Sequence, residues 1–187
     1  MVTSSTPDRP RQVAEAVLQI IAARGTDAVS VREVAAALGL SIGAIQHHFS
    51  TKAEMLEFAF RHSVARIRDR VAVLPPSGDR ARDIRIVLRE LLPLDETCRA
   101  DTAVHLAFAS LAVTTPGLQA IQHDLLAGIR SELVDVLGPG HEAHAAMLLA
   151  AVDGLALHAI SAPGGLDPGD LEAALGVAVD AALRPVG

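Results

Sequence analysis

The sequence of 187 residues contains no tryptophan, no tyrosine and four phenylalanines, whereas alanine is its most frequent residue. Strands are enriched in aromatic and β-branched side chains, and alanine is the strongest helix former. The composition therefore argues against a β-sandwich and predicts an all-α fold. The chain also has a single cysteine, Cys98, which cannot form a disulfide within the chain. This is the pattern expected of a protein in the reducing cytoplasm.

Long apolar runs are missing as well. The longest run, residues 145–152, has eight residues and ends at Asp153, whereas a membrane-spanning helix needs about 20. The N-terminal sequence MVTSSTPDRPRQ is polar and lacks the apolar segment of a secretory signal. We therefore expect a cytoplasmic protein with no membrane partner.

An excess of positive charge is absent too. The 16 Lys and Arg residues face 22 Asp and Glu residues, for a net charge of −6, so a basic protein that coats nucleic acid without selectivity is excluded. Contacts with phosphates would have to come from a small local patch. The sequence also lacks a glycine-rich phosphate loop, metal-ligand spacing of Cys and His, and a G-x-S-x-G nucleophile motif. We expect no enzyme, no cofactor and no metal site.

The apolar residues recur with the helical period along the whole chain. Glycine, proline and capping residues divide this pattern into nine predicted helices and no strand. The predicted helices run from Arg9 to Gly25, Ser30 to Gly39, Ile42 to about His48, Ser50 to Pro75, Asp79 to Leu92, Asp95 to about Val113, Pro116 to Gly138, about Glu142 to Ile160, and Asp167 to Leu183.

The first three helices have the lengths and spacing of a helix-turn-helix DNA-binding unit. Ala35 lies where the second helix must let the third pass closely, and Gly39 lies in the turn, where a positive φ requires a residue without a Cβ. The third helix carries mostly small residues, so its backbone can approach the floor of a major groove about 12 Å wide. This spacing predicts DNA binding.

The run from Val13 to Phe60, and especially SVREVAAALGLSIGAIQHHFSTKAEML, resembles the N-terminal domain of the TetR family of bacterial transcriptional regulators. The segment LLPLDETCRADTAVHLAFASLAV and the later Val-Asp-Gly at 152–154 resemble the C-terminal domain of the branch with choline-responsive repressors. The resemblance implies a DNA-binding domain at residues 9–50 and a helical ligand-binding and dimerisation domain at 51–187. The helix at about 51–74 would connect them.

The resemblance also implies which residues contact DNA. Ser30 and Ser41 would cap helices whose N-termini point at phosphates. Gln46 stands where the family usually has a tyrosine that reaches a phosphate, and glutamine can bind either a phosphate or an adenine edge. Adjacent His47 and His48 point about 100° apart on a helix, so they are poorly placed to share a metal ion. The expected DNA-binding residues are Ser30, Arg32, Ser41, Ile42, Gly43, Ala44, Gln46, His47, His48 and Lys52.

A small-molecule effector is expected to bind among the helices of residues 79–160. Apolar walls with a few polar groups are typical of such cavities, although ordinary core packing explains the apolar residues equally well. Asp153 interrupts the most apolar helix, where it is paired with an arginine such as Arg99 or Arg130, lies near the surface, or is a polar group in the cavity. The expected lining residues are Leu88, Leu91, Thr102, His105, Leu106, Phe108, Leu111, Gln122, Leu126, Met147 and Asp153.

Two ridges of small residues in the last two helices are expected to form a homodimer interface, because small side chains let helices approach closely. The ridges consist of Ala146, Ala150 and Gly154, and of Ala174, Ala178 and Ala182. Packing of these helices against each other within one chain is the alternative.

Together these observations predict a TetR-type regulator, a repressor that binds a palindromic operator as a dimer and responds to a ligand. Two other classes stay open: an enzyme or small-molecule binding module without DNA, and a helical adaptor that uses the N-terminal domain for protein contacts. A steep fall of DNA affinity with salt would distinguish the regulator from both.

Overall fold

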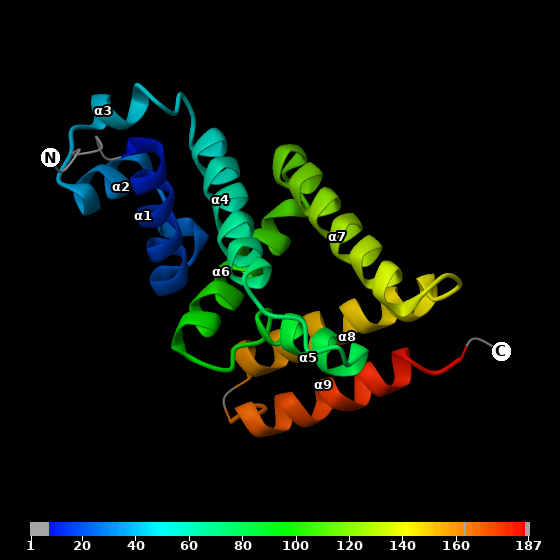
Figure 1. The fold of residues 1–187 in the computed structure, drawn as a ribbon. Coiled ribbons are helices and arrows are strands. Elements are labelled where there is room, and N and C mark those ends of the chain that lie inside the picture. Colours follow the sequence, from blue (N-terminus) through cyan, green and yellow to red (C-terminus); the bar gives the residue numbers. More distant parts are fainter. Residues whose placement is uncertain (1–7, 163, 186–187) are drawn as a thin grey trace, which may run out of the picture.

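The computed structural model describes residues 8–162 and 164–185 (Figure 1). Within them the chain forms nine α-helices, one short 3₁₀ helix and no strand, so the predicted all-α fold is confirmed. The helices are α1 (Arg9–Arg24), α2 (Val31–Leu38), α3 (Ile42–Gln46), α4 (Lys52–Ala72), α5 (Arg80–Arg89), α6 (Glu96–Ala112), α7 (Pro116–Leu137), α8 (Glu142–Ser161) and α9 (Pro168–Ala182), with the 3₁₀ helix η1 at Thr26–Ala28.

Side-chain caps explain where most helices begin. The Thr51 hydroxyl accepts a hydrogen bond from the Glu54 amide at 3.1 Å, and the Glu54 carboxylate accepts one from the Ser50 amide at 2.8 Å. This arrangement is a capping box in which the Glu54 carboxylate binds the amide of the residue before the N-cap. The Asp167 carboxylate caps α9 in the same way, at 2.8 Å from the Asp170 amide. Thr115 occupies the N-cap position of α7 and Pro116 the first helical position, but the Thr115 side chain makes no cap bond.

The buried side chains form two hydrophobic cores. The first joins α1, α2, α3 and the first half of α4 to the later part of α6 and the start of α7. The second joins α5, the end of α7, α8 and α9. Figure 1 shows α2 and α3 at one end of the molecule and the antiparallel pair α8 and α9 at the opposite end, with α4 and α7 running between them. Ile129 of α7 packs against both cores.

The first core crosses the expected domain boundary between residues 50 and 51. Phe60 of α4 and Phe108 of α6 have no exposed surface, and their rings stack with centroids 4.5 Å apart. Val17 of α1 is buried in the same cluster. The N-terminal helices are therefore packed onto α4 and α6 by apolar contacts and are not joined to them by a flexible linker.

Candidate nucleic-acid interface and effector cavity

Helices α2 and α3 form the expected helix-turn-helix. Gly39 ends α2 with a φ of 64°, which is the left-handed conformation that glycine adopts at little cost. Ala35 is 2% exposed and Ile45 is fully buried, so both helices contribute small or branched apolar side chains to the first core. Phe49, which follows α3 and is 5% exposed, belongs to the same core. The packing fixes which face of α3 points away from the protein.

The outward face of α3 carries the side chains that the sequence predicts for DNA contact. Ile42, Gly43, Gln46 and His47 are exposed, and Ala44 is half-buried. Helix α3 ends at Gln46 and not near His48 as expected, so His47 and His48 lie in the turn that follows, both exposed, with their rings 5.1 Å apart. All of these residues therefore reach the surface, Ala44 only in part.

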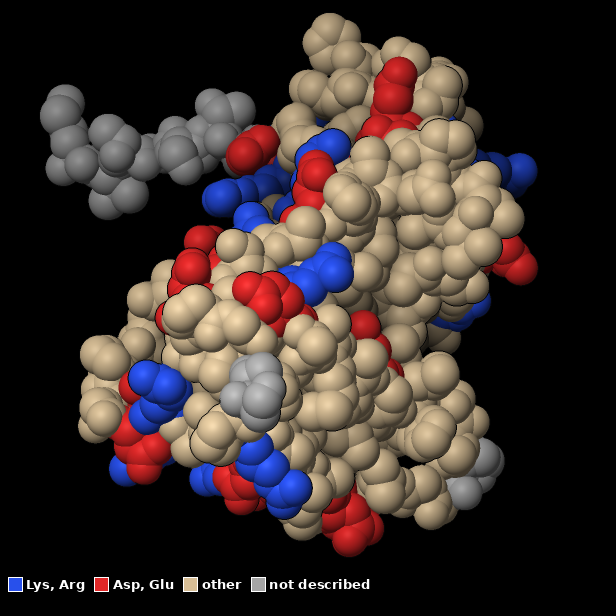
Figure 2. Space-filling model, turned by 90° about the vertical axis from the view of Figure 1, so that its right-hand side faces the viewer, with Lys and Arg blue, Asp and Glu red and all other residues tan. Residues whose placement is uncertain are grey.

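Polar groups that could contact phosphates surround this face. The Ser41 and Ser30 hydroxyls accept hydrogen bonds from the Ala44 and Glu33 amides at 3.2 and 3.1 Å, which confirms both N-caps. Arg32 is exposed. The Lys52 ammonium donates to the Thr26 carbonyl at 3.3 Å and remains exposed. Figure 2 presents the side of the molecule opposite to α2 and α3, where acidic and basic side chains are interspersed without a broad basic area.

A cavity of about 250 Å³ lies between the two hydrophobic cores, enclosed by α4, α5, α6, α7 and α8. Six of the expected residues line it: Leu88, Leu91, Thr102, His105, Leu126 and Asp153. The sequence did not predict that α4 forms a wall. The second half of α4 faces the cavity with Ser63, Val64, Ile67, Arg68 and Val71.

Five expected residues lie elsewhere. Phe108 belongs to the first core, where it stacks on Phe60, and Leu111 packs against the same core. Met147 is 46% exposed on the outer side of α8. Leu106 and Gln122 are half-buried but do not line the cavity, and the buried Gln122 Oε1 has no hydrogen-bond partner in the described part of the chain. The helical period alone does not distinguish a wall residue from a core residue.

The polar groups of the cavity are mainly carboxylates. Asp153 makes no ion pair within the described residues, so of the alternatives left open by the sequence it is a polar group of the cavity and not a partner of Arg99 or Arg130. Burial raises the pKa of its carboxyl group. Burial also lowers the pKa of His105, which favours a neutral ring. The other charged residues in the walls are Arg68, Asp83, Glu90, Asp101 and Glu132. Five acidic residues therefore face one basic residue.

The predicted dimer ridges differ in their exposure. Ala146 and Ala150 of α8 are exposed, and Gly154, Ala174 and Ala178 are half-buried. Ala182 is fully buried in the second core, because α9 turns this side chain toward its own chain. It therefore offers no surface to a second copy.

An apolar surface nevertheless covers α8 and α9. Met147, Leu157 and Val177 are 46%, 47% and 72% exposed. Helix α8 is long and apolar enough to cross a membrane by length and composition alone. Of its most apolar stretch of 18 residues, 33% is buried inside the chain. The outer side of these helices therefore leaves apolar area uncovered.

The described residues hold no group of three His, Cys, Asp or Glu side chains that could bind a metal ion. Cys98 is buried, and burial raises the pKa of its thiol to about 11. The thiol is therefore protonated at neutral pH.

Known proteins resemble the chain over nearly its whole length. Residues 14–59 match the family model of bacterial regulatory proteins of the tetR family, and residues 80–184 match that of the C-terminal domain of BetI-type transcriptional repressors. The HTH-type transcriptional regulator PksA of Bacillus subtilis is 32% identical over 83% of this chain and 80% of that protein.

Solved structures agree with this family. A transcriptional regulator from Rhodococcus sp. Rha1 has 43% identity and a TM-score of 0.89, with 93% of this chain and 95% of that chain covered. The choline complex of a regulator from Saccharomonospora viridis has 20% identity and a TM-score of 0.83, with 94% and 97% covered, and shows the same fold. The chain is a DNA-binding transcriptional regulator, and it belongs to the TetR family with a C-terminal domain of the BetI type.

Proposed function

We propose that this protein is a dimeric repressor that inserts α3 into the major groove and releases its operator when an effector fills the cavity. The observation that supports it best is the outward face of α3, where Gln46 and His47 are exposed beside the capped N-terminus at Ser41. Residues 9–50 would bind DNA, and residues 51–187 would bind the effector and the second subunit. A protein with this role acts in the cytoplasm and needs no catalytic activity, cofactor or metal.

In this proposal the phosphate contacts come from Ser30, Ser41, His48 and Lys52, which surround the recognition helix. The base contacts come from the residues that protrude from it or stand beside it. Glutamine can bind adenine through two hydrogen bonds, and an apolar side chain can contact the methyl group of thymine. The base-reading set is Arg32, Ile42, Gly43, Ala44, Gln46 and His47.

A second copy of the chain is the occupant that we assign to the apolar face of α8 and α9. Ala146 and Ala150 are small and exposed, so helices of two subunits can approach closely there. Gly154, Ala174 and Ala178 would lie at the edge of the contact. One recognition helix of five residues reads few bases, and a twofold dimer doubles the contacts, with half-sites about 34 Å apart or a multiple of that distance.

The effector that fits the cavity is a small molecule with an apolar body and a positively charged amine or ammonium group. The half-buried Asp153 has no ion-pair partner in the described part of the chain and favours a cation. Of the other wall carboxylates, Glu90 and Asp101 are already paired with Arg70 and Arg66. The regulator from Saccharomonospora viridis, which shares the fold, was solved with the cation choline. This chain has no tyrosine or tryptophan, so aliphatic side chains, and not an aromatic cage, would surround the ligand.

The energy needed for release is small. An effector that favours the DNA-free arrangement by about 3 kcal/mol weakens operator binding by about two orders of magnitude. We propose that α4 transmits this preference, because its first half belongs to the first core and its second half forms a wall of the cavity.

Selection of genomic fragments by the purified full-length protein tests the DNA-binding part. We expect one or a few fragments with an inverted repeat to be enriched, and Gln46→Ala to weaken binding and relax the base preference at one position in each half-site. Gln119→Ala on the exposed side of α7 serves as the control. Equal retention of all fragments would overturn the proposed specificity.

Calorimetry with hexyltrimethylammonium chloride tests the effector class. We expect this probe to bind, and Asp153→Asn to weaken it by at least tenfold, whereas hexanoate, which carries the opposite charge, should not bind. Tighter binding of hexanoate would overturn the cationic class.

A further inference from the structure

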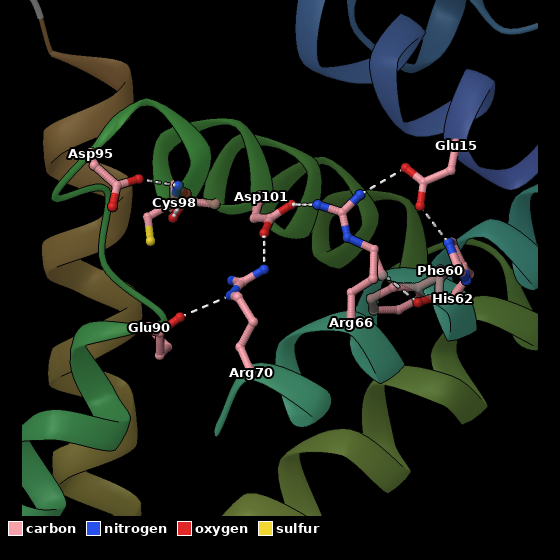
Figure 3. A network of polar contacts seen from close by, with 11 residues as sticks. Glu15, Phe60, His62, Arg66, Arg70, Glu90, Asp95, Cys98 and Asp101 are labelled. Carbon is pink, nitrogen blue, oxygen red and sulfur yellow. Dashed lines mark hydrogen bonds and ion pairs between the residues drawn. The ribbon is translucent and has the colours of Figure 1, made fainter. Parts of the chain in front are cut away.

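Helix α4 carries three cationic or ionisable side chains, His62, Arg66 and Arg70, at intervals of four residues. This spacing places them on one face of the helix, one above the other. Figure 3 shows that all three side chains point toward carboxylates that belong to other elements of the chain. We call the following set the α4 ion-pair network: His62, Arg66 and Arg70 with Glu15 of α1, Glu90 at the end of α5 and Asp101 of α6.

The end of the network nearest the DNA-binding domain is anchored at Glu15. His62 Nε2 lies 2.6 Å from Glu15 Oε1, and Arg66 Nη1 donates to Glu15 Oε2 at 2.8 Å. Both oxygens of this carboxylate are thus engaged by α4. Since Glu15 belongs to α1, the central helix of the first core, these bonds tie the position of the N-terminal helices to the face of α4.

The other end reaches the effector cavity. Arg66 Nη2 donates to Asp101 Oδ1 at 3.0 Å, and Arg70 Nη1 donates to Asp101 Oδ2 at 2.7 Å. Arg70 Nε donates to Glu90 Oε2 at 2.9 Å. Glu90 and Asp101 both line the cavity. Among the described lining residues, Asp101 alone pairs with an arginine that also binds α1.

The network is partly shielded from water, which strengthens its ion pairs relative to pairs on the surface. The side chains of Asp101, Arg70 and Arg66 are 12%, 30% and 32% exposed. Burial by itself lowers the pKa of Arg70, but the hydrogen bonds and charges of Glu90 and Asp101 outweigh it and raise that pKa. Arg70 Nη2 is buried and has no hydrogen-bond partner in the described part of the chain.

We propose that Asp101 couples occupancy of the cavity to the orientation of the DNA-binding helices, with the α4 ion-pair network as the connection. The inference rests on the proposed effector response and goes beyond it by naming the residue that carries the signal. Asp101 is a positioning residue in this proposal, since it acts on α1 through Arg66.

The geometry of the guanidinium group makes this coupling directional. The two Nη atoms of the rigid, planar Arg66 guanidinium group donate to Glu15 and to Asp101. A movement of this group toward one carboxylate therefore weakens its hydrogen bond to the other. A cationic ligand in the cavity attracts Asp101 and competes with Arg66 and Arg70 for its oxygens. Arg66 is then released from α6, and α1 loses its fixed distance from the cavity wall.

The test compares wild type with Asp101→Asn, which keeps the shape of the side chain and removes its charge. Asp69→Asn on the exposed side of α4 gives the same change of net charge outside the network. Binding of hexyltrimethylammonium is measured by calorimetry, and binding of the selected operator fragment by fluorescence anisotropy with and without that probe.

For wild type and Asp69→Asn we expect the bound probe to weaken operator binding by about 5- to 150-fold, the usual range of allosteric coupling. For Asp101→Asn we expect weaker binding of the probe, which is therefore added at a saturating concentration, and we expect the bound probe to change operator binding by less than about twofold. A merely structural role of Asp101 would lower stability but leave this release intact. Release of the operator by the probe from Asp101→Asn to the same extent as from wild type overturns the proposal.

A second experiment, which needs no ligand, tests the coupling through Asp101 if the probe does not bind. Val87→Lys, or Leu126→Lys if the first variant does not fold, places a positive charge in the cavity wall. We expect this attached cation to weaken operator binding in the wild-type background and not in the Asp101→Asn background. Equal weakening in both backgrounds, or none in either, overturns the coupling by Asp101. Failure of the probe alone contradicts only the proposed cationic effector, and failure to select an operator contradicts the proposed DNA-binding function.

Discussion

The turn between α2 and α3 allows a sharp test of the helix-turn-helix geometry, through the substitution Gly39→Ala. Gly39 has a φ of 64°, and a Cβ built there would meet no atom within 4 Å. The cost of alanine is therefore conformational and not steric. A left-handed conformation costs an L-residue about 1–2 kcal/mol, and the reduced freedom of the unfolded chain returns about 0.4–1 kcal/mol. The net loss should be about 1 kcal/mol.

For a chain of this size, that loss lowers the melting temperature by about 2–4 °C. Gly39→Asn should cost less, because asparagine tolerates the left-handed region. Gly176→Ala is the matched control: it also has open space around the new Cβ but lies inside α9 without a positive φ, so alanine should stabilise the protein by about 0.5–1 kcal/mol. Thermal unfolding followed by circular dichroism measures all three. A Gly39→Ala variant as stable as wild type would refute the reasoning.

Three further predictions concern the surface, the dimer and the cavity. Lys52→Ala should lower the salt dependence of operator binding by about one unit of log K against log salt, as measured by anisotropy; an unchanged slope would remove Lys52 from the phosphate contacts. Ala150→Arg should yield a folded monomer by light scattering, whereas Ala120→Arg on exposed α7 should remain a dimer; a dimeric Ala150→Arg contradicts the α8–α9 interface. Asp153→Asn should raise the melting temperature at pH 7. The raised pKa of Asp153 means that wild type loses stability as pH rises above about 4, so the gain should shrink in acid, and a gain independent of pH would exclude this cause.

The positions of the helices were largely predictable from the sequence, because their signals are local. The Thr51 and Glu54 pair, the Asp167-Pro168 start and the positive φ at Gly39 each depend on a few neighbouring residues. The 3₁₀ helix at Thr26–Ala28 and the early end of α3 were not predicted. In both places the chain leaves the α-helical period for a few residues.

The cavity was predicted only in part, because its walls come from five helices distant in sequence. Leu88, Leu126 and Asp153 lie where the pattern placed them, but Phe108 fills the first core. An apolar stripe shows that a face is covered and does not show whether side chains or empty space cover it. One feature of the α4 ion-pair network is visible in the sequence, namely the four-residue spacing of the basic positions on α4. The carboxylates that pair with them could not be predicted from the sequence.

The sequence by itself determined the all-α composition, the helix boundaries and the exposed face of the recognition helix, since caps, turns and periodicity act over a few residues. The tertiary structure decided that two hydrophobic cores meet at a cavity, that Ala182 faces its own chain, and that Asp101 lies between Arg66 and Arg70. Such contacts depend on how distant helices cross, and the crossing is set by the combined shape of all the buried side chains.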